Sequence, residues 1–236
     1  MTIPTEESTA QKGLLSYVDQ SAVQWIQQTS QEFFTLMSYY KCAMMEVETK
    51  FNVLNEEFSL QLDRNPISGI KTRLKSFSGI REKLERKGLP LNAETMQESL
   101  NDIAGVRVVC SFLDDIYLLA GCLLQQDDVT LLDIKDYISE PKPNGYRSLH
   151  LIVQIPIYLR QGKRNVKVEI QLRTIAMDCW ASLEHQLRYK KEFGQNEDTA
   201  RELLECARLS AELDARMESL RKEVLSTDAD IKEDLI

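Results

Sequence analysis

The chain has 236 residues, of which 43% are hydrophobic and 28% are charged, a composition typical of a soluble globular protein. Its formal net charge of −8 argues against broad binding to nucleic acid or to an anionic membrane surface. No apolar run approaches the roughly 18 residues of a membrane helix, and residues 1–13 lack the pattern of a signal peptide. Five scattered cysteines form no Cys-x-x-Cys pair, which predicts free thiols in the cytoplasm.

The first part of the chain is predicted to be helical. We expect residues 1–20 to be loosely ordered and residues 21–62 to form a helix, because apolar side chains recur there at spacings of three and four. This stripe consists of Val47, Phe51, Leu54, Phe58 and Leu62. Asn65-Pro66 ends the helix. A second helix is predicted from Ser78 to Lys87.

The segment from Lys71 to Lys87 is basic although the protein is acidic. It contains Lys71, Arg73, Lys75, Arg81, Lys83, Arg86 and Lys87 against only Glu82 and Glu85. Such a segment is either a binding site for an anion or a solvated helix face. The charge pattern alone favours the solvated face.

The centre of the chain has the alternation of β-strands. Val106–Phe112 is rich in β-formers, and Arg107 points away from the face that carries Val106. Asp114 is predicted to cap a helix that continues to about Leu124. Another strand is predicted within Val129–Ile138.

Two further strands are predicted before the C-terminal helices. Leu149–Ile155 alternates, and Pro156 ends its regular part. A charged turn over residues 160–165 then leads to the clearest strand. Its apolar face carries Val166, Val168, Ile170 and Leu172, and its polar face carries Lys167, Glu169, Gln171 and Arg173.

The remaining residues are predicted to form two helices. The first presents Ala176, Trp180, Leu183 and Leu187 on one side, and the second runs from about Asn196, a candidate N-cap, to Leu225. The second helix has an apolar stripe at heptad-like spacing, made of Cys206, Leu209, Leu213, Met217, Leu220 and Val224. This stripe serves either packing on its own domain or contact with another copy.

These elements predict an α+β fold, in which a mixed β-sheet is flanked by helices and has helical extensions at both ends. We expect four segments along the chain. They are a flexible N-terminus (1–20), an N-terminal helical extension (21–64), a central domain (65–192), and a C-terminal helix with its tail (193–236).

Two carboxylates are candidates for chemistry. Asp102 lies just before the strand that carries Arg107, and Glu169 lies on the polar face of its own strand. If the two strands are neighbours, both carboxylates could hold Mg²⁺ together with phosphate oxygens. A carboxylate beside a metal can also accept a proton from a hydroxyl. The alternative is two unrelated surface acids.

A loop that runs into a strand is a second candidate. Gly145 allows a tight backbone turn, and Tyr146 can present a flat ring on which a base stacks. His150 lies on the polar side of the following strand. An ordinary hairpin turn also accounts for Pro143-Asn144-Gly145, although it does not require the tyrosine or the histidine.

At these residues the chain resembles the synthetase domain of the RelA/SpoT family. The matching stretches are Asp102-Ile103-Ala104-Gly105-Val106-Arg107, Asp136-Tyr137-Ile138, Pro143 to His150, Glu169-Ile170-Gln171-Leu172-Arg173-Thr174, and Trp180-Ala181-Ser182-Leu183-Glu184-His185 to Lys190-Lys191, with Arg73-Leu74-Lys75 and Lys83. Each stretch alone is a weak signal. All of them in one order, over about residues 65–191, make a chance match improbable.

The resemblance implies a nucleotidyltransferase-like synthetase fold and a reaction. A GTP pyrophosphokinase of this family moves pyrophosphate from ATP to the 3′-hydroxyl of GDP or GTP, giving ppGpp or pppGpp and AMP in the stringent response. The resemblance also implies that Asp102 and Glu169 contact Mg²⁺ and that Glu169 activates the hydroxyl. The basic segment then serves a function.

The resemblance further implies the substrate contacts. On the ATP side they are Arg73, Lys75, Lys83, Arg86 and Arg107, of which Arg73 and Arg107 would sandwich adenine with flat guanidinium groups. On the side of GDP or GTP they are Tyr146, His150, Asn144, Lys142, Gln171 and Arg173. Tyr146 would stack on guanine.

Among family members, the chain is most similar to the small, single-domain alarmone synthetases. The stretch Ile70-Lys71-Thr72-Arg73 and the strand 167–174 look closer to the RelP type than to the RelQ type. Such synthetases form homotetramers, so we expect a homotetramer. The hydrolase of the long members requires a His-Asp motif and further histidines, and this chain has only two histidines, so we expect no hydrolase activity.

One position departs from the family. Gly79 stands where a serine is common, and the adjacent Ser78 could replace it. Two rival functions stay open: a pyrophosphotransferase with another acceptor, and a nucleotide-binding regulatory module without activity. The presence of Asp102, Glu169 and Tyr146 argues against the second. We expect neither a membrane nor an obligatory nucleic acid as a partner.

Overall fold

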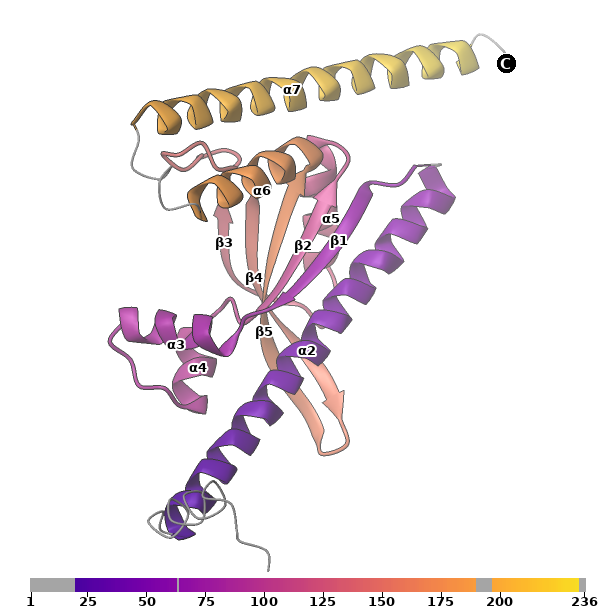
Figure 1. The fold of residues 1–236 in the computed structure, drawn as a ribbon. Helices are drawn as coiled ribbons and strands as arrows, with labels where there is room; N and C mark the ends of the chain where they lie inside the picture. Colours follow the sequence, from indigo (N-terminus) through magenta and orange to yellow (C-terminus); the bar gives the residue numbers. More distant parts are fainter. Residues whose placement is uncertain (1–19, 63, 190–196, 234–236) are drawn as a thin grey trace, which may run out of the picture.

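A five-stranded β-sheet organises the protein, which we describe from a computed structural model (Figure 1). The structure describes residues 20–62, 64–189 and 197–233. The predicted flexible N-terminus, except for Gln20, and the predicted N-cap Asn196 therefore lie outside the described residues. The elements are α2 (Gln20–Leu62), β1 (Ile67–Leu74), α3 (Phe77–Arg86), α4 (Ala93–Ser99), β2 (Ala104–Cys110), α5 (Leu113–Leu124), β3 (Thr130–Asp136), β4 (Leu149–Leu159), β5 (Gly162–Thr174), α6 (Ile175–Tyr189) and α7 (Glu197–Glu233).

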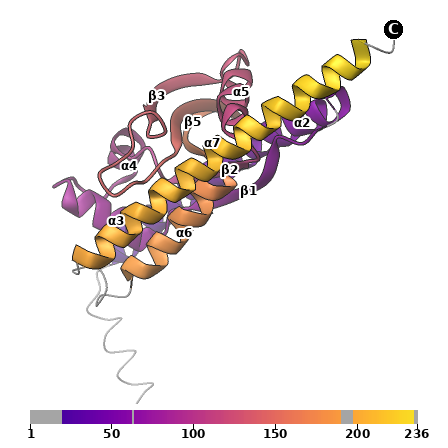
Figure 2. The ribbon, with the colours of Figure 1, turned by 90° about the horizontal axis from the view of Figure 1, so that it is seen from above.

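The sheet is mixed, as the sequence predicts. Its strand order is β1-β2-β5-β4-β3, and the central pair β2 and β5 is parallel while the other neighbours are antiparallel. The α2 helix crosses one face of the sheet, and α5 packs beside it (Figure 1). Seen from above, α7 runs alongside α6 (Figure 2). None of the described helices has the length and apolar character needed to cross a bilayer.

The core lies between the sheet and the α2–α5 layer. The predicted apolar faces of β2, β4 and β5 are buried there, and α2 covers them with Val47, Phe51 and Leu54. The opposite face of the three central strands carries polar side chains that are half-buried, such as His150 and Glu169. Alternation along the strands therefore separates the core from the face on which chemistry can occur.

Some boundaries differ from the sequence prediction. The segment Ile67–Leu74, which the sequence did not mark as a strand, forms the edge strand β1. An edge strand needs one neighbour only, and the exposed or half-buried side chains of β1 show no apolar alternation. The short helix α4 was also not predicted.

Four further boundaries were predicted wrongly. The residue that caps α5 is Phe112, without a side-chain hydrogen bond, and Asp114 lies in the first turn. Strand β4 continues through Pro156, because β3 no longer pairs with it beyond Gln154 and a proline is tolerated where a ladder neighbour is absent. Strand β4 ends at Leu159 and strand β5 begins at Gly162, so the turn between them is shorter than the predicted 160–165. Helix α7 extends to Glu233, beyond the predicted Leu225.

The buried stripe of α2 predicts a large effect of a core truncation. Phe51 is fully buried, so Phe51→Ala should lower the free energy of unfolding by about 3–5 kcal/mol, because it leaves a cavity. The control is Val53→Ala on the same helix, which is 60% exposed and should change that free energy by about 0.5 kcal/mol or less. Urea unfolding followed by circular dichroism measures both, and equal losses would contradict this placement of the core.

Candidate active site

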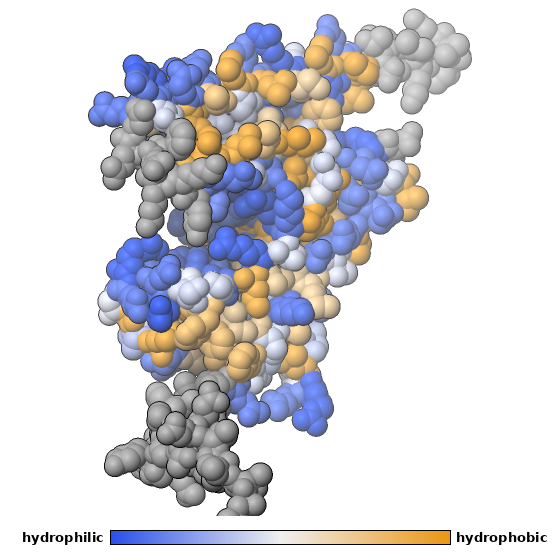
Figure 3. Space-filling model, viewed as in Figure 1, coloured by the Kyte–Doolittle hydropathy of each residue, from blue (hydrophilic) through white to orange (hydrophobic). Residues whose placement is uncertain are grey.

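A pocket of about 470 Å³ opens on the polar face of the sheet. In the space-filling view a hydrophilic recess lies between α6 and the α3–α4 pair (Figure 3). The pocket is lined by Lys71, Arg73, Lys75, Asp102, Gly105, Val106, Arg107, Lys142, Tyr146, His150, Glu169 and Gln171. These residues come from β1 and the residue after it, from β2 and the segment before it, from β4 and the loop before it, and from β5, so only the assembled sheet creates the pocket.

Asp102 lies at the entrance to β2 between two lysines. Its Oδ2 is 3.0 Å from Nζ of Lys75 and 2.7 Å from Nζ of Lys83. Burial alone would raise the pKa of the Asp102 carboxyl, but hydrogen bonds and charges from Lys83 and Lys75 outweigh burial and lower it. The other oxygen, Oδ1, is buried and has no hydrogen-bond partner among the residues that the structure describes. Asp102 is therefore ionised and keeps one oxygen free for a ligand.

Glu169 lies on β5 opposite Gly105 of β2, so the parallel pairing brings it close to Asp102. Its Oε2 accepts a hydrogen bond of 3.0 Å from Nε2 of Gln171, and its Oε1 lies 3.7 Å from Nδ1 of His150. Burial, and to a lesser extent the charge of Asp102, favour a raised pKa for Glu169, yet the interactions with His150 and the hydrogen bond from Gln171 together outweigh them and lower the pKa. At neutral pH the side chain is a carboxylate that can accept a proton.

An aromatic cluster forms one wall of the pocket. The ring of Tyr146 meets His150 and Tyr137 edge-on, with centroid separations of 5.8 and 6.1 Å. Nζ of Lys142 lies over both tyrosine rings, at 4.4 and 4.8 Å from their centroids. The Tyr146 hydroxyl lies 2.8 Å from Nε2 of His150 and accepts a hydrogen bond of 2.5 Å from Nη2 of Arg173. This wall can offer a flat ring to a base and cations to its phosphates.

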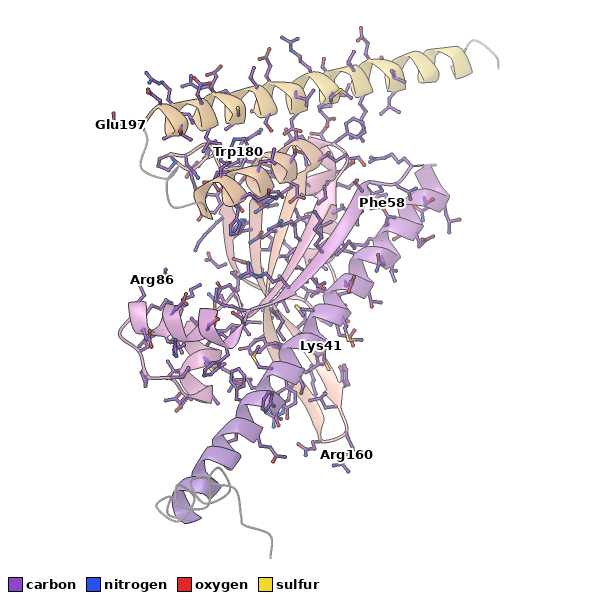
Figure 4. All side chains as sticks on the ribbon, in the orientation of Figure 1. Lys41, Phe58, Arg86, Arg160, Trp180 and Glu197 are labelled. Carbon is purple, nitrogen blue, oxygen red and sulfur yellow. The ribbon has the colours of Figure 1, made fainter. Side chains whose placement is uncertain are left out.

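The loop that carries Tyr146 is held from behind by α6 and α7. Gly145 has φ of +87°, and a Cβ there would lie 2.4 Å from Cβ of Ala207 on α7, so only glycine fits. Asn144 donates its amide to Oε1 of Glu184 on α6. Trp180 of α6, which Figure 4 labels below α7, packs with Ala207 and Tyr146. The close packing of this loop against α6 and α7 therefore fixes the position of Tyr146 in the pocket wall.

Residues 72–193 match the domain described as the region found in RelA/SpoT proteins. The chain belongs to the RelA/SpoT family. It is 46% identical to the GTP pyrophosphokinase YwaC of Bacillus subtilis over 185 residues, which cover 78% of this chain and 88% of YwaC. It is 38% identical to the GTP pyrophosphokinase YjbM of the same organism, over 80% of this chain and 89% of YjbM.

Solved structures of this family have the same fold. The crystal structure of small alarmone synthetase 2 from Bacillus subtilis gives a TM-score of 0.74 at 43% identity and covers 81% of this chain and 99% of its own. The structure of small alarmone synthetase 1 from Bacillus subtilis, bound to its product pppGpp, gives a TM-score of 0.72 at 37% identity and covers 78% of this chain and 94% of its own. The predicted resemblance and the predicted fold class are thereby confirmed.

Most of the residues that the RelA/SpoT resemblance marked lie around the pocket. Nine line it directly: Arg73, Lys75, Asp102, Arg107, Lys142, Tyr146, His150, Glu169 and Gln171. Lys83 lies beside Asp102 instead. Their individual roles stay predictions.

Three other marked residues do not line the pocket. Arg86 is exposed at the outer end of α3 (Figure 4), Asn144 is bonded to Glu184, and Arg173 is 3% exposed behind Tyr146. These three residues lie outside the pocket wall, and their contacts with substrate stay predictions. Ser78, the candidate replacement for a serine at Gly79, has its Oγ 3.0 Å from Oγ of Ser76, which caps α3.

Three residues of the site were not marked as site residues by the sequence. Lys71 lines the pocket from β1, Tyr137 joins the aromatic wall, and Asp178 binds Arg107 and Arg173. Lys71 could have been found from the basic segment, and Tyr137 from the stretch Asp136-Tyr137-Ile138. For Asp178 the local sequence carries no signal, because its partners are far away in the chain.

The lysine pair predicts how the Asp102 carboxyl titrates. Lys83→Met should raise the pKa of Asp102, because it removes a hydrogen bond and a positive charge while burial continues to favour the neutral acid. Carboxyl NMR of labelled aspartate measures the shift. The control Arg81→Met, on the same helix but paired with Glu85, should leave that pKa unchanged. An unchanged pKa in Lys83→Met would contradict the proposed pairing.

Proposed function

We propose that this chain is a GTP pyrophosphokinase, which transfers pyrophosphate from ATP to the 3′-hydroxyl of GDP or GTP and so makes ppGpp or pppGpp for the stringent response. The observation that carries the proposal is the position of Glu169. Its ionised carboxylate lies in one pocket with a cationic wall, represented by Arg73 and Lys75, and with the aromatic wall around Tyr146. Relatives named GTP pyrophosphokinase are 46% and 38% identical to this chain, and a small alarmone synthetase shares its fold.

The residues of the pocket can perform the transfer as follows. Glu169 accepts the proton of the acceptor's 3′-hydroxyl, whose oxygen then bonds to the β-phosphorus of ATP. The bond between that phosphorus and the oxygen bridging to the α-phosphate breaks, and AMP leaves. Lys75 and Lys83 can turn from Asp102 to the phosphates as charge-assisted donors. Arg73 and Arg107 offer flat guanidinium groups to adenine, and Tyr146 offers its ring to guanine.

The donor set also fits Mg²⁺. Asp102 and Glu169 line the same pocket. Oδ1 of Asp102 is buried and finds no hydrogen-bond partner in the described part of the chain, which is consistent with an oxygen that binds a cation. A bound Mg²⁺ would neutralise charge on the phosphate oxygens. Two protein carboxylates suffice for this ion, because phosphate and water oxygens supply its other ligands.

The proposal includes a cytoplasmic location. Nucleotide substrates occur there, and the five cysteines are all free thiols, as a reducing compartment permits. The rival functions are distinguished by assay rather than by location. A pyrophosphotransferase with another acceptor would keep Asp102 and Glu169 but would have no use for the aromatic wall. A regulatory module would bind nucleotides without releasing AMP.

Purified protein incubated with ATP and Mg²⁺ should release AMP when GDP or GTP is added, and the second product should be ppGpp or pppGpp. Anion-exchange chromatography measures all four nucleotides. Activity should disappear with a chelator and return with added Mg²⁺. In parallel, ppGpp incubated with the protein should give no GDP, since no hydrolase activity is expected. AMP release only with other acceptors, or none with any acceptor, would overturn the proposal.

Glu169→Gln tests the proposed base. The amide keeps the shape of the side chain but cannot accept the proton, so kcat should fall by roughly 10²–10⁴-fold. Binding of ATP and GDP, measured by calorimetry, should change little. The control Glu82→Gln, on the exposed surface of α3, should retain full activity. If Glu169→Gln keeps the wild-type kcat, another group is the base.

We also propose that the protein is a homotetramer assembled through α7. The inner face of α7 meets its own domain with polar side chains, since Asp214 and Glu218 are buried. The predicted apolar stripe is instead exposed: Leu209, Leu213, Met217, Leu220 and Val224 are each 45–60% exposed. Packing on the same domain does not bury this stripe, and an exposed row of large apolar side chains supports contact with another copy.

The apolar stripe predicts a specific disruption. The double change Leu213→Glu and Met217→Glu should shift the protein to smaller assemblies, because charged carboxylates would have to be buried in the interface. Size-exclusion chromatography with light scattering measures the mass. Ser219→Glu, an exposed position on α7 outside the stripe, is the control and should keep the wild-type mass. An unchanged mass in the double variant would show that α7 does not form the interface.

A further inference from the structure

Asp178 is a buried carboxylate that the proposed reaction does not use. It lies in the first turn of α6, directly after β5 leads out of the sheet, and is 7% exposed. A buried charge is costly unless partners compensate it. The partners of Asp178 therefore indicate what the side chain does.

Three cations meet at this one carboxylate. Oδ1 accepts hydrogen bonds from Nη1 of Arg107 at 3.1 Å and from Nη1 of Arg173 at 3.4 Å. Oδ2 accepts a hydrogen bond of 3.0 Å from Nζ of Lys71. Burial would raise the pKa of Asp178, but Lys71 and the two arginines outweigh it and lower the pKa. The group is an anion with both oxygens engaged.

The two arginines belong to different sides of the pocket. Arg107 lines the pocket from β2, beside Arg73 and Lys75. Arg173 lies behind the aromatic wall, where its Nη2 donates to the Tyr146 hydroxyl at 2.5 Å and to Oε1 of Gln171 at 3.1 Å. A displacement of Arg173 would move Tyr146 on the acceptor side of the pocket. A displacement of Arg107 would instead change the cationic wall on the ATP side.

The arginine pair needs an anion between its members. Burial lowers the pKa of Arg107, and the charge of Arg173 lowers it further, whereas Asp178 raises it. The buried Nε atoms of both arginines have no hydrogen-bond partner among the described residues. The contact of Nη1 with Asp178 therefore helps to hold each guanidinium plane, and for Arg173 the contacts of Nη2 with Tyr146 and Gln171 add to it. Without the carboxylate, two like charges would face each other in a partly dry site and separate.

We propose that Asp178 is a positioning residue that holds Arg107 and Arg173 at a set distance and thereby couples the donor side of the pocket to the acceptor side. This inference rests on the proposed pyrophosphokinase reaction for the identity of the two ligands. It assigns to Asp178 no contact with substrate. ATP bound against Arg107, or the acceptor bound against Tyr146, to which Arg173 donates, would through Asp178 favour the bound arrangement on the other side of the pocket.

The variant Asp178→Asn tests the inference, because the amide keeps the size but loses the charge and one acceptor. KM for ATP and KM for GDP should each rise roughly fivefold or more, as expected when charge-assisted hydrogen bonds are lost, and kcat should fall less. Binding of a non-hydrolysable ATP analogue, measured by calorimetry, should be tightened by GDP in the wild type and not in the variant. Asp133→Asn, which affects only a pair with Lys135 on β3, is the matched control and should match the wild type.

A double-mutant cycle separates positioning from a general structural role. If Asp178 acts through Arg107, the double variant Asp178→Asn/Arg107→Gln should raise KM for ATP by less than the product of the two single-variant fold-changes. Wild-type KM values for both nucleotides in a folded Asp178→Asn variant would overturn the proposal, and so would a rise for ATP alone. If the asparagine variant does not fold, Asp178→Glu shifts the carboxylate by one methylene and should still raise both KM values.

The outcome for Asp178 is distinguishable from the outcome for the reaction. If the wild type releases no AMP with GDP or GTP, the proposed reaction fails, whereas calorimetry of the two nucleotides still tests the coupling. If the wild type is active and the variants bind both nucleotides as tightly and as cooperatively as the wild type, only the role of Asp178 fails.

Discussion

The parallel pairing of β2 and β5 is the constraint on which the pocket depends. It places Gly105 opposite Glu169, so that Asp102, at the entrance to β2, comes to lie near Glu169 of β5. One face of both strands is apolar and buried under α2, which fixes the register, because a slip by one residue would exchange the two faces. The burial of the core therefore positions the two carboxylates.

Local charge balance decides the chemistry of this pocket in a protein whose net charge is −8. Two of the carboxylates have cationic partners that lower their pKa values: two lysines for Asp102, and two arginines with Lys71 for Asp178. The lysines at Asp102 are the same groups that can bind phosphates. A substrate phosphate could therefore replace Asp102 as the partner of these two lysines.

Helix α7 connects the pocket with the outer surface. Its inner face carries Asp214, which accepts a hydrogen bond from Thr174 at the end of β5 and lies 3.5 Å from Arg147 beside Tyr146. Ala207 of the same helix closes over Gly145. Its apolar stripe remains exposed on the other side. If α7 moved on contact with another copy, the loop that presents Tyr146 would move with it, because Ala207 and Asp214 of α7 contact that loop.

The sequence by itself determined the alternating strands, the long helices and the ordered motifs that mark the family, since these depend on neighbours along the chain. It placed Glu169 on a polar strand face and Tyr146 in a turn. Only the tertiary structure decided that Ile67–Leu74 is an edge strand, since its pairing with β2 and not its own pattern creates it. The structure also decided the place of Asp178, which meets Arg107 across 71 positions of sequence. Long-range contacts of this kind leave no local pattern, because the packing of distant elements creates them.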